Sequence, residues 1–288
     1  MTSVGLTPLN DLLGGAYKGE SGGLYPGRTN SHPGHSTGLA LARAIGPRDV
    51  NGTPDAGGKY ALVSIGMSNT TMEFSAFKAL ADREPGRDSH LVIVDGAQGG
   101  QTASLWINPS CPCWGVLDSR IQAAGVSASQ VAIVWLKEAD AGPSSGWPAY
   151  AQQLKNEIET MLQMLKQRFP NLRIAYLSSR IYAGYATTAL NPEPYAFESA
   201  FSVRGVIQDQ LSGMAALDVA SGRAPWVAWG PYLWADGIRP RSDGLTWACS
   251  DLSSSDGTHP SATGQQKVAA LLLDFMRTDA TAREWFLQ

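Results

Sequence analysis

Residues 60–81 read YALVSIGMSNTTMEFSAFKALA, in which an apolar run is followed by a short turn and then by a helical segment. The run Tyr60–Ile65 is rich in apolar residues and does not alternate with polar ones, which is typical of a parallel strand covered on both faces. Thr71–Ala81 is expected to form the helix that follows. A strand that turns sharply into a helix is the repeating unit of parallel α/β sheets, so this segment indicates that class of fold.

Four more short apolar runs have the same character, and helical segments separate them. The runs are Leu91–Val94, Val131–Trp135, Leu172–Leu177 and Trp226–Trp229. Apolar residues recur at helical spacing over Tyr150–Phe169 and Ser261–Arg277, and a shorter helix is expected over Ser36–Ile45. This alternation of strands and helices predicts an α/β fold, a three-layer αβα sandwich with about five parallel strands.

The composition favours a single domain over residues 1–288, with a loop-rich N-terminal extension, residues 1–45, packed on it. Hydrophobic residues make up 43% of the 288 residues, which is enough for one sizeable core. The formal net charge is −3 and no run of Lys or Arg occurs, so we expect no nucleic-acid partner. No apolar stretch approaches the roughly 18 residues of a membrane span, so we expect no membrane partner.

The first residues, MTSVGLTPLNDLLGG, lack the basic start and long apolar stretch of a signal peptide. We expect a secreted or periplasmic protein whose signal peptide is absent from this sequence, or otherwise a cytoplasmic one. The sequence leaves the oligomeric state open.

The three cysteines leave several arrangements open. The Cys111-Pro112-Cys113 spacing is too tight for a comfortable local disulfide. Either one of these two cysteines forms a bridge to Cys249, or all three are reduced.

Ser68 stands where the first strand turns into its helix. Gly66, two residues earlier, permits a tight turn, and the unpaired amides of a helix N-terminus stabilise negative charge. Ser68 is therefore a candidate nucleophile for acyl transfer, although a serine here could equally act only as a helix cap. After the second strand, glycines in residues 95–102 would let backbone amides approach a ligand, unless they form an ordinary turn.

The segment Asp256-Gly257-Thr258-His259-Pro260 precedes the last helix. An Asp three residues before a His on a tight loop can hydrogen-bond Nδ1, which leaves Nε2 free to accept a proton from a serine. Ser68, His259 and Asp256 are therefore the candidate nucleophile, base and orienting acid of a catalytic triad.

These motifs resemble those of the SGNH hydrolases, also called the GDSL esterase and lipase family. The resemblance covers residues 60–277 and includes Gly66-Met67-Ser68, the glycine block with Gly99, and the Asp-x-x-His-Pro block, which matches fully. It implies a flavodoxin-like fold, a Ser68–His259–Asp256 triad, and an oxyanion hole built from the backbone amides of Ser68 and Gly99, with Gly100 as a further candidate.

The third block departs from the family pattern. Where the family usually has Gly-x-Asn-Asp, this chain has Trp135-Leu136-Lys137-Glu138-Ala139-Asp140, which is similar to the third block of carbohydrate acetylesterases of the same clan. Lys137 could supply the missing oxyanion donor. Alternatively, Glu138 neutralises Lys137 and both residues are structural.

Aromatic residues crowd the segment before the catalytic loop. Trp234, Tyr232 and Trp247 are candidates for a sugar- or acyl-binding platform, although core packing explains some of them. Asp236, Arg239 and Arg241 are expected to form a solvated charge cluster rather than a site for an acidic substrate.

No metal or cofactor is expected. His32 and His35 lack acidic or cysteine partners, and no phosphate-binding glycine motif follows the first strand. The sequence predicts a serine esterase that hydrolyses short-acyl, most simply acetyl, esters of a small molecule or carbohydrate. The alternatives are a catalytically silent carbohydrate-binding protein on the same fold and a lipase-like esterase for longer acyl chains.

Overall fold

Five apolar runs of the chain form one parallel sheet in the computed structural model, which describes residues 2–288. Its strands are β3 (Tyr60–Gly66), β4 (Leu91–Val94), β5 (Val131–Lys137), β6 (Ile174–Leu177) and β7 (Trp226–Trp229). Nearly every strand residue is buried, because helices cover both faces. A separate two-stranded hairpin pairs β1 (Ala16–Tyr17) with β2 (Glu20–Ser21).

The strand order is β4-β3-β5-β6-β7, so the first strand of the sheet lies between the second and the third. This is the flavodoxin-like order, and it confirms the predicted fold class. After β3 the chain adds β4 on one side of it, and then adds β5 on the other side. The direction in which strands are added therefore reverses, which creates a switch point between β3 and β5. Gly66 pairs with Lys137 at the carboxyl ends of these two strands.

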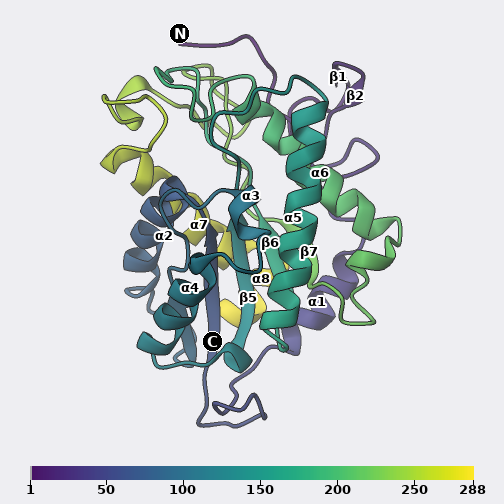
Figure 1. Ribbon diagram of the computed structural model, residues 1–288, viewed down its shortest axis with the longest axis vertical. Coiled ribbons are helices and arrows are strands. Elements are labelled where there is room, and N and C mark those ends of the chain that lie inside the picture. Colours follow the sequence, from purple (N-terminus) through teal and green to yellow (C-terminus); the bar gives the residue numbers. More distant parts are fainter. Residues whose placement is uncertain (1) are drawn as a thin grey trace.

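The helices form two layers around the sheet (Figure 1). One layer holds α1 (His35–Arg43), α2 (Ser68–Ala81), α7 (Ala262–Thr278) and α8 (Ala280–Phe286). In it α2 packs on α7, α7 on α8, and α8 on α1. The other layer holds α3 (Ala103–Trp106), α4 (Pro112–Ala123), α5 (Ala149–Arg168) and α6 (Tyr195–Leu211). There α5 packs on α6 and on α3, and the ion pair of Arg168 with Asp118 joins α5 to α4.

The predicted elements differ from the observed ones mainly at their ends. Two strands are shifted: β5 continues to Lys137, and β6 begins at Ile174. The helix after β3 begins at Ser68 itself rather than at Thr71. The long helices α4 and α6 are missed, and for α6 the reason is that most of its side chains are buried, so no apolar stripe stands out from a polar face.

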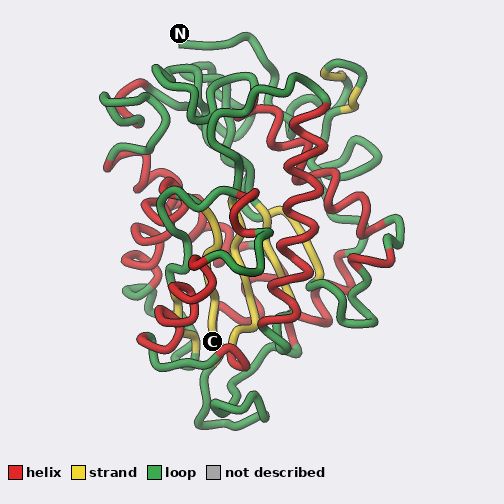
Figure 2. Tube along the Cα trace, viewed as in Figure 1, coloured by secondary structure: helices red, strands yellow, loops and turns green. Residues whose placement is uncertain are grey.

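Long loops gather at the carboxyl ends of the strands, the end of the sheet drawn uppermost in Figure 2. The N-terminal residues lie there against the chain after β7. Asp236 accepts hydrogen bonds from the amides of Val4 (2.7 Å) and Gly5 (3.1 Å) and from the hydroxyl of Ser3 (2.6 Å). The side chain of Asp236 is almost fully buried, so the N-terminal extension is fixed by a carboxylate more than 200 residues away in sequence.

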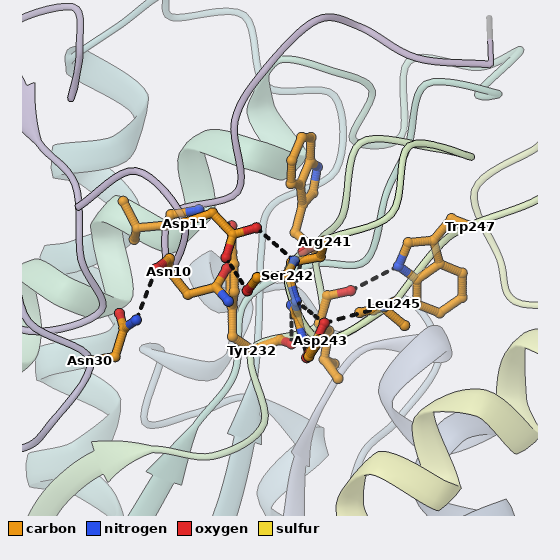
Figure 3. A network of polar contacts seen from close by, with 12 residues as sticks. Asn10, Asp11, Asn30, Tyr232, Arg241, Ser242, Asp243, Leu245 and Trp247 are labelled. Atoms are coloured by element: carbon orange, nitrogen blue, oxygen red, sulfur yellow. Dashed lines mark hydrogen bonds and ion pairs between the residues drawn. The ribbon is translucent and has the colours of Figure 1, made fainter. Parts of the chain in front are cut away.

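Arg241 stabilises the same loop region through several hydrogen bonds (Figure 3). Its guanidinium donates to the carbonyl oxygens of Tyr232 (2.7 Å) and Trp234 (3.0 Å) and forms a two-point ion pair with Asp243. Ser242, next to it, donates both its amide and its hydroxyl to Asp11 of the N-terminal extension. The expectation of a solvated charge cluster is therefore wrong for Asp236 and Arg241. Both side chains are buried, and both form hydrogen bonds with backbone groups of the loops.

The cysteines also differ from the expectation. Cys111 and Cys113 form a disulfide with each other, and Cys249 is free and exposed. Pro112 begins α4 with Cys111 as its N-cap, and this turn brings the two Cα atoms to 5.2 Å, within the range that a disulfide spans. Among residues 2–288 there is no helix with the length and apolar character to cross a membrane.

We expect Asp236→Ala to loosen the N-terminal residues, because the amide of Val4 loses its acceptor and that of Gly5 keeps only the Ser3 hydroxyl. Hydrogen exchange at these two amides should accelerate, and the free energy of unfolding should fall by about 1–3 kcal/mol. Asp218→Ala is the matched control, since the exposed Asp218 accepts only from amides of its own turn. Unchanged protection of Val4 and Gly5 in Asp236→Ala would contradict this role.

Candidate active site

Ser68, His259 and Asp256 meet at the carboxyl end of the sheet. Ser68 Oγ lies 2.7 Å from His259 Nε2, and His259 Nδ1 lies 2.7 Å from Asp256 Oδ2. The side chains of His259 and Asp256 are 25% and 17% exposed, so the imidazole is reachable from solvent while the carboxylate is largely covered. The structure thus brings the three predicted residues into one hydrogen-bonded chain, with the geometry of a nucleophile, a base and an orienting acid.

Asp256 uses its two carboxylate oxygens for different tasks. Oδ2 faces the imidazole, while Oδ1 accepts the amides of Thr258 (2.8 Å) and His259 (2.9 Å). Partial burial acts to raise the pKa of Asp256, but these amides and the imidazole outweigh it and hold the pKa below its usual value. The acid therefore stays ionised while it also shapes the loop that carries the base.

The loop is closed by backbone contacts on both sides. Ser253 N donates to the carbonyl oxygen of His259 (2.7 Å), and Gly257 N donates to that of Ser253 (2.8 Å). Gly257 has a φ of +61°, and a Cβ there would meet the Tyr185 carbonyl oxygen at 2.0 Å. The glycine of the Asp-Gly-Thr-His motif is thus required by both its conformation and its surroundings.

The turn before Ser68 is equally confined. Gly66 packs so closely on the end of β5 that a Cβ would meet the Lys137 carbonyl oxygen at 2.4 Å. Ser68 then begins α2, with Met67 as an N-cap that offers no side-chain acceptor. Within residues 2–288 the amide of Ser68 donates no hydrogen bond, so it points out of the helix start as a free donor.

The glycine block after β4 lies against the nucleophile. A Cβ built on Gly99 would be 3.9 Å from Ser68 Cβ, whereas one built on Gly100 would have no atom within 4 Å. Gln98 N donates to the Gly66 carbonyl oxygen (2.9 Å), which fixes this block to the turn that precedes Ser68. Gly99 therefore lies beside the nucleophile, and the roles of the Gly99 and Gly100 amides in an oxyanion hole stay predictions.

Asp95 is a structural residue of the site that the motif comparison did not single out. Its carboxylate accepts hydroxyl hydrogen bonds from Ser64 (2.6 Å) on β3 and from Thr71 and Ser75 (2.8 Å) on α2. Asp95 also accepts the amide of Ala97 (3.2 Å) in the glycine block. One carboxylate thus holds the glycine block, the strand and the nucleophile helix together. Its place directly after an apolar strand was the available signal, since functional groups gather there.

Lys137 does not reach the surface of the site. Its side chain is 1% exposed, and Nζ lies 2.5 Å from Glu73 Oε2 on α2. Burial lowers the pKa of Lys137 to about 8 and raises the pKa of Glu73, and each charge opposes the shift of the other. The interpretation of Lys137 as an oxyanion donor is therefore wrong, because its ammonium is committed to a buried partner. That partner is Glu73, which is distant in sequence, rather than the neighbouring Glu138.

The three candidate aromatic residues lie in the core. Trp234 and Trp247 are fully buried and donate their indole N–H groups to Glu193 and to the Leu233 carbonyl oxygen. Tyr232 is 5% exposed and accepts the amide of Leu9. The prediction that they line the substrate cleft is wrong, because their polar atoms serve the packing of the loops above the sheet.

A small pocket opens beside the triad. It has a volume of about 20 Å³ and is lined by Met67, Ser68, Asn69, Ala141, Arg180, Leu190, Asn191, Thr258 and His259. Larger hollows, such as one of about 260 Å³ between α5 and α6, lie away from Ser68. The described residues contain no cluster of three or more His, Cys, Asp or Glu side chains that could hold a metal ion.

We expect Lys137→Met to lower the free energy of unfolding by about 3–5 kcal/mol, because it leaves the buried Glu73 carboxyl without its partner. Replacing both residues, as Lys137→Met with Glu73→Leu, should restore much of this loss, since neither member of the pair is left as an unpaired buried charge. Urea unfolding followed by tryptophan fluorescence measures both. A double variant less stable than the single variant would contradict the account.

Comparisons with known proteins give structural likeness only. No protein-family model matches the chain, and no curated protein matches its sequence. A protein of Bacillus subtilis aligns with 76% of this chain at 11% identity and a TM-score of 0.40, and 56% of that protein is covered, so this chain spans little more than half its length.

A Bacteroides fragilis protein described as a candidate acylhydrolase aligns with 82% of this chain and is itself covered over 91%, at 12% identity and a TM-score of 0.41. The periplasmic domain of a lipopolysaccharide acetyltransferase from Salmonella ser. Paratyphi A aligns with 75% and is covered over 83%, at 13% identity and a TM-score of 0.42. At this level the likeness does not show the family or the activity of this chain, which are inferred from the residues and their geometry.

Proposed function

We propose that this protein is a serine esterase of the SGNH hydrolase type that hydrolyses short-acyl carboxylic esters. The observation that carries the proposal is the continuous hydrogen-bonded chain from Ser68 Oγ through His259 to Asp256, with 2.7 Å at each step. A helix cap or a structural Asp–His turn would not require a serine from α2 to meet an imidazole 191 residues later in the chain.

In the proposed reaction, Ser68 Oγ attacks the ester carbonyl carbon while its proton passes to His259 Nε2. His259 then gives this proton to the departing alcohol oxygen, which leaves the acyl group on Ser68. A water molecule loses a proton to the same nitrogen and attacks the acyl carbon. The carboxylic acid leaves, and the proton returns to Ser68 Oγ. Asp256 holds the imidazole in the tautomer that exposes Nε2 and stabilises its cationic form.

The negative charge on the carbonyl oxygen is assigned to the amides of Ser68 and Gly99. The two residues lie at the start of α2 and in the adjacent glycine block, and no acceptor within residues 2–288 occupies their amides. Such donors are most effective when they are fixed before the reaction starts. The hydrogen bonds that Asp95 accepts from α2, and the one that Gln98 N donates to Gly66, hold α2 and the glycine block in place.

The size of the pocket supports a short acyl group. A volume of about 20 Å³ holds one group the size of a water molecule or a methyl group, and Met67, Ala141 and Leu190 supply apolar lining. A long acyl chain does not fit this description, so the small volume beside Ser68 supports a short acyl group. A carbohydrate as the alcohol half of the ester is supported by the resemblance of residues 135–140 to carbohydrate acetylesterases. The buried aromatic residues Trp234, Tyr232 and Trp247 do not support it.

We expect Ser68→Ala to reduce kcat/KM for p-nitrophenyl acetate by about 10⁴-fold or more, because no other group can form the acyl-enzyme. Labelling by a fluorophosphonate probe should be lost in parallel. Ser119→Ala, which alters an exposed serine on α4, is the control and should behave as wild type. A wild-type protein that binds sugars but neither labels nor turns over esters would indicate the silent binding protein instead.

The pH dependence gives a further expectation. Because the pKa of Asp256 lies below its ordinary value, its carboxylate stays charged as the pH falls toward 4. The acidic limb of kcat/KM should therefore contain no contribution from Asp256 and should have a slope of one. A slope of two between about pH 4 and 6 would show that Asp256 is protonated in the same range.

A further inference from the structure

The pocket beside Ser68 and His259 has a polar wall that the triad does not use. Three of its lining residues, Asn69, Arg180 and Asn191, are at most 2% exposed. Each has a polar side-chain atom that is buried and has no hydrogen-bond partner within residues 2–288: Asn69 Nδ2, Arg180 Nε and Asn191 Oδ1. Unpartnered buried groups are rare because they cost stability, so three around one pocket require an explanation.

The orientation of the Asn69 side chain is set by Arg180. Arg180 Nη1 donates to Asn69 Oδ1 at 2.7 Å. Because a guanidinium can only donate, the carboxamide must present its oxygen to Arg180 and its NH₂ group in the other direction. Asn69 Nδ2 is thereby left as a donor, one residue after the nucleophile.

Asn191 is oriented in the opposite sense. Its Nδ2 donates to the Asp140 carbonyl oxygen (3.2 Å) and lies 3.4 Å from the Tyr150 hydroxyl, which itself accepts the Asp140 amide. The carbonyl oxygen can only accept, so Asn191 Oδ1 is left as an acceptor. The residues that line the pocket therefore carry unpartnered donors on Asn69 and Arg180 and an unpartnered acceptor on Asn191.

Arg180 forms no ion pair with a carboxylate in the part of the chain that the structure describes. It follows β6, whereas Asn69 lies on α2 and Asn191 lies in the loop before α6. Three separate elements thus contribute one polar group each to the same small volume, next to the atoms that carry the proposed reaction.

We infer that this pocket is a subsite for a hydroxyl group of the ester substrate, recognised by Asn69, Arg180 and Asn191. A hydroxyl is one heavy atom that accepts and donates, so it can accept from Asn69 Nδ2 while it donates to Asn191 Oδ1 within about 20 Å³. A methyl group can pair with neither the donors nor the acceptor, and a carboxylate cannot donate to Asn191 Oδ1. The inference rests on the proposed esterase function and adds a specificity determinant to it.

The hydroxyl can belong to either half of the ester, and two matched substrate pairs distinguish these sources. For the alcohol half, 2-hydroxyethyl acetate is compared with propyl acetate. For the acyl half, ethyl glycolate is compared with ethyl propionate. In each pair a hydroxyl replaces a methyl group of similar size. Each kcat/KM is divided by the rate constant for alkaline hydrolysis of the same ester, which removes differences in intrinsic reactivity.

Wild-type protein should prefer the hydroxyl member of one pair by about tenfold or more, as expected for the loss of a buried hydrogen-bond partner. Asn69→Ala should bring that ratio close to one. Asn69→Asp should do the same and keeps an acceptor for Arg180, so it serves if the alanine variant does not fold. Leu190→Ala, which enlarges the same pocket without removing a polar group, is the control and should change both members of a pair alike.

A wild-type ratio near one in both pairs, with measurable turnover, would overturn the subsite and leave the pocket as a place for a water molecule. A preference that survives in both Asn69 variants would overturn it as well. Absence of turnover of every ester, p-nitrophenyl acetate included, would instead refute the proposed esterase function. The two failures are therefore distinguishable.

Discussion

The buried ion pair between Lys137 and Glu73 is the interaction on which the geometry of the site depends. It joins the end of β5 to the second turn of α2, the helix that begins at Ser68. Thr70 Oγ1 also donates to the Lys137 carbonyl oxygen (2.7 Å), and Gly66 packs on the same oxygen. One residue of the central sheet thus fixes the strand, the turn and the helix that set the position of Ser68. Two opposite charges with little access to water hold this junction more rigidly than exposed side chains could.

Two aspartates extend this rigidity to the other parts of the site. Asp95 connects the glycine block to α2, and Asp256 connects the imidazole to its own loop. Each carboxylate accepts several hydrogen bonds at once, which stabilise its charge without a lysine or arginine partner. The proposed nucleophile, base and oxyanion donors are consequently fixed by three acidic residues, and only the third of them, Glu73, uses a lysine.

The sequence was sufficient for the features that are local. The five strands were predicted because each is a compact apolar run, and Asp256 with His259 because their spacing defines a short loop. Long-range features were not accessible in this way. Lys137 looked like a free cation because its partner Glu73 lies 64 residues earlier in the chain. Trp234 and its aromatic neighbours looked like a platform because burial depends on where the N-terminal loops pack. Asn69 and Arg180 escaped notice because their pairing spans 111 residues.

The separation of Ser68 from His259 along the chain also has a consequence for biosynthesis. Ser68, the proposed nucleophile, is synthesised 191 residues before His259, the proposed base, which comes shortly before the last helices. Contacts between such distant residues form late, since the intervening chain must first be ordered. A nascent or truncated chain would therefore expose an ordinary, unreactive serine. The proposed ester hydrolysis would begin only when the C-terminal segment has docked, so that such activity would itself report completed folding.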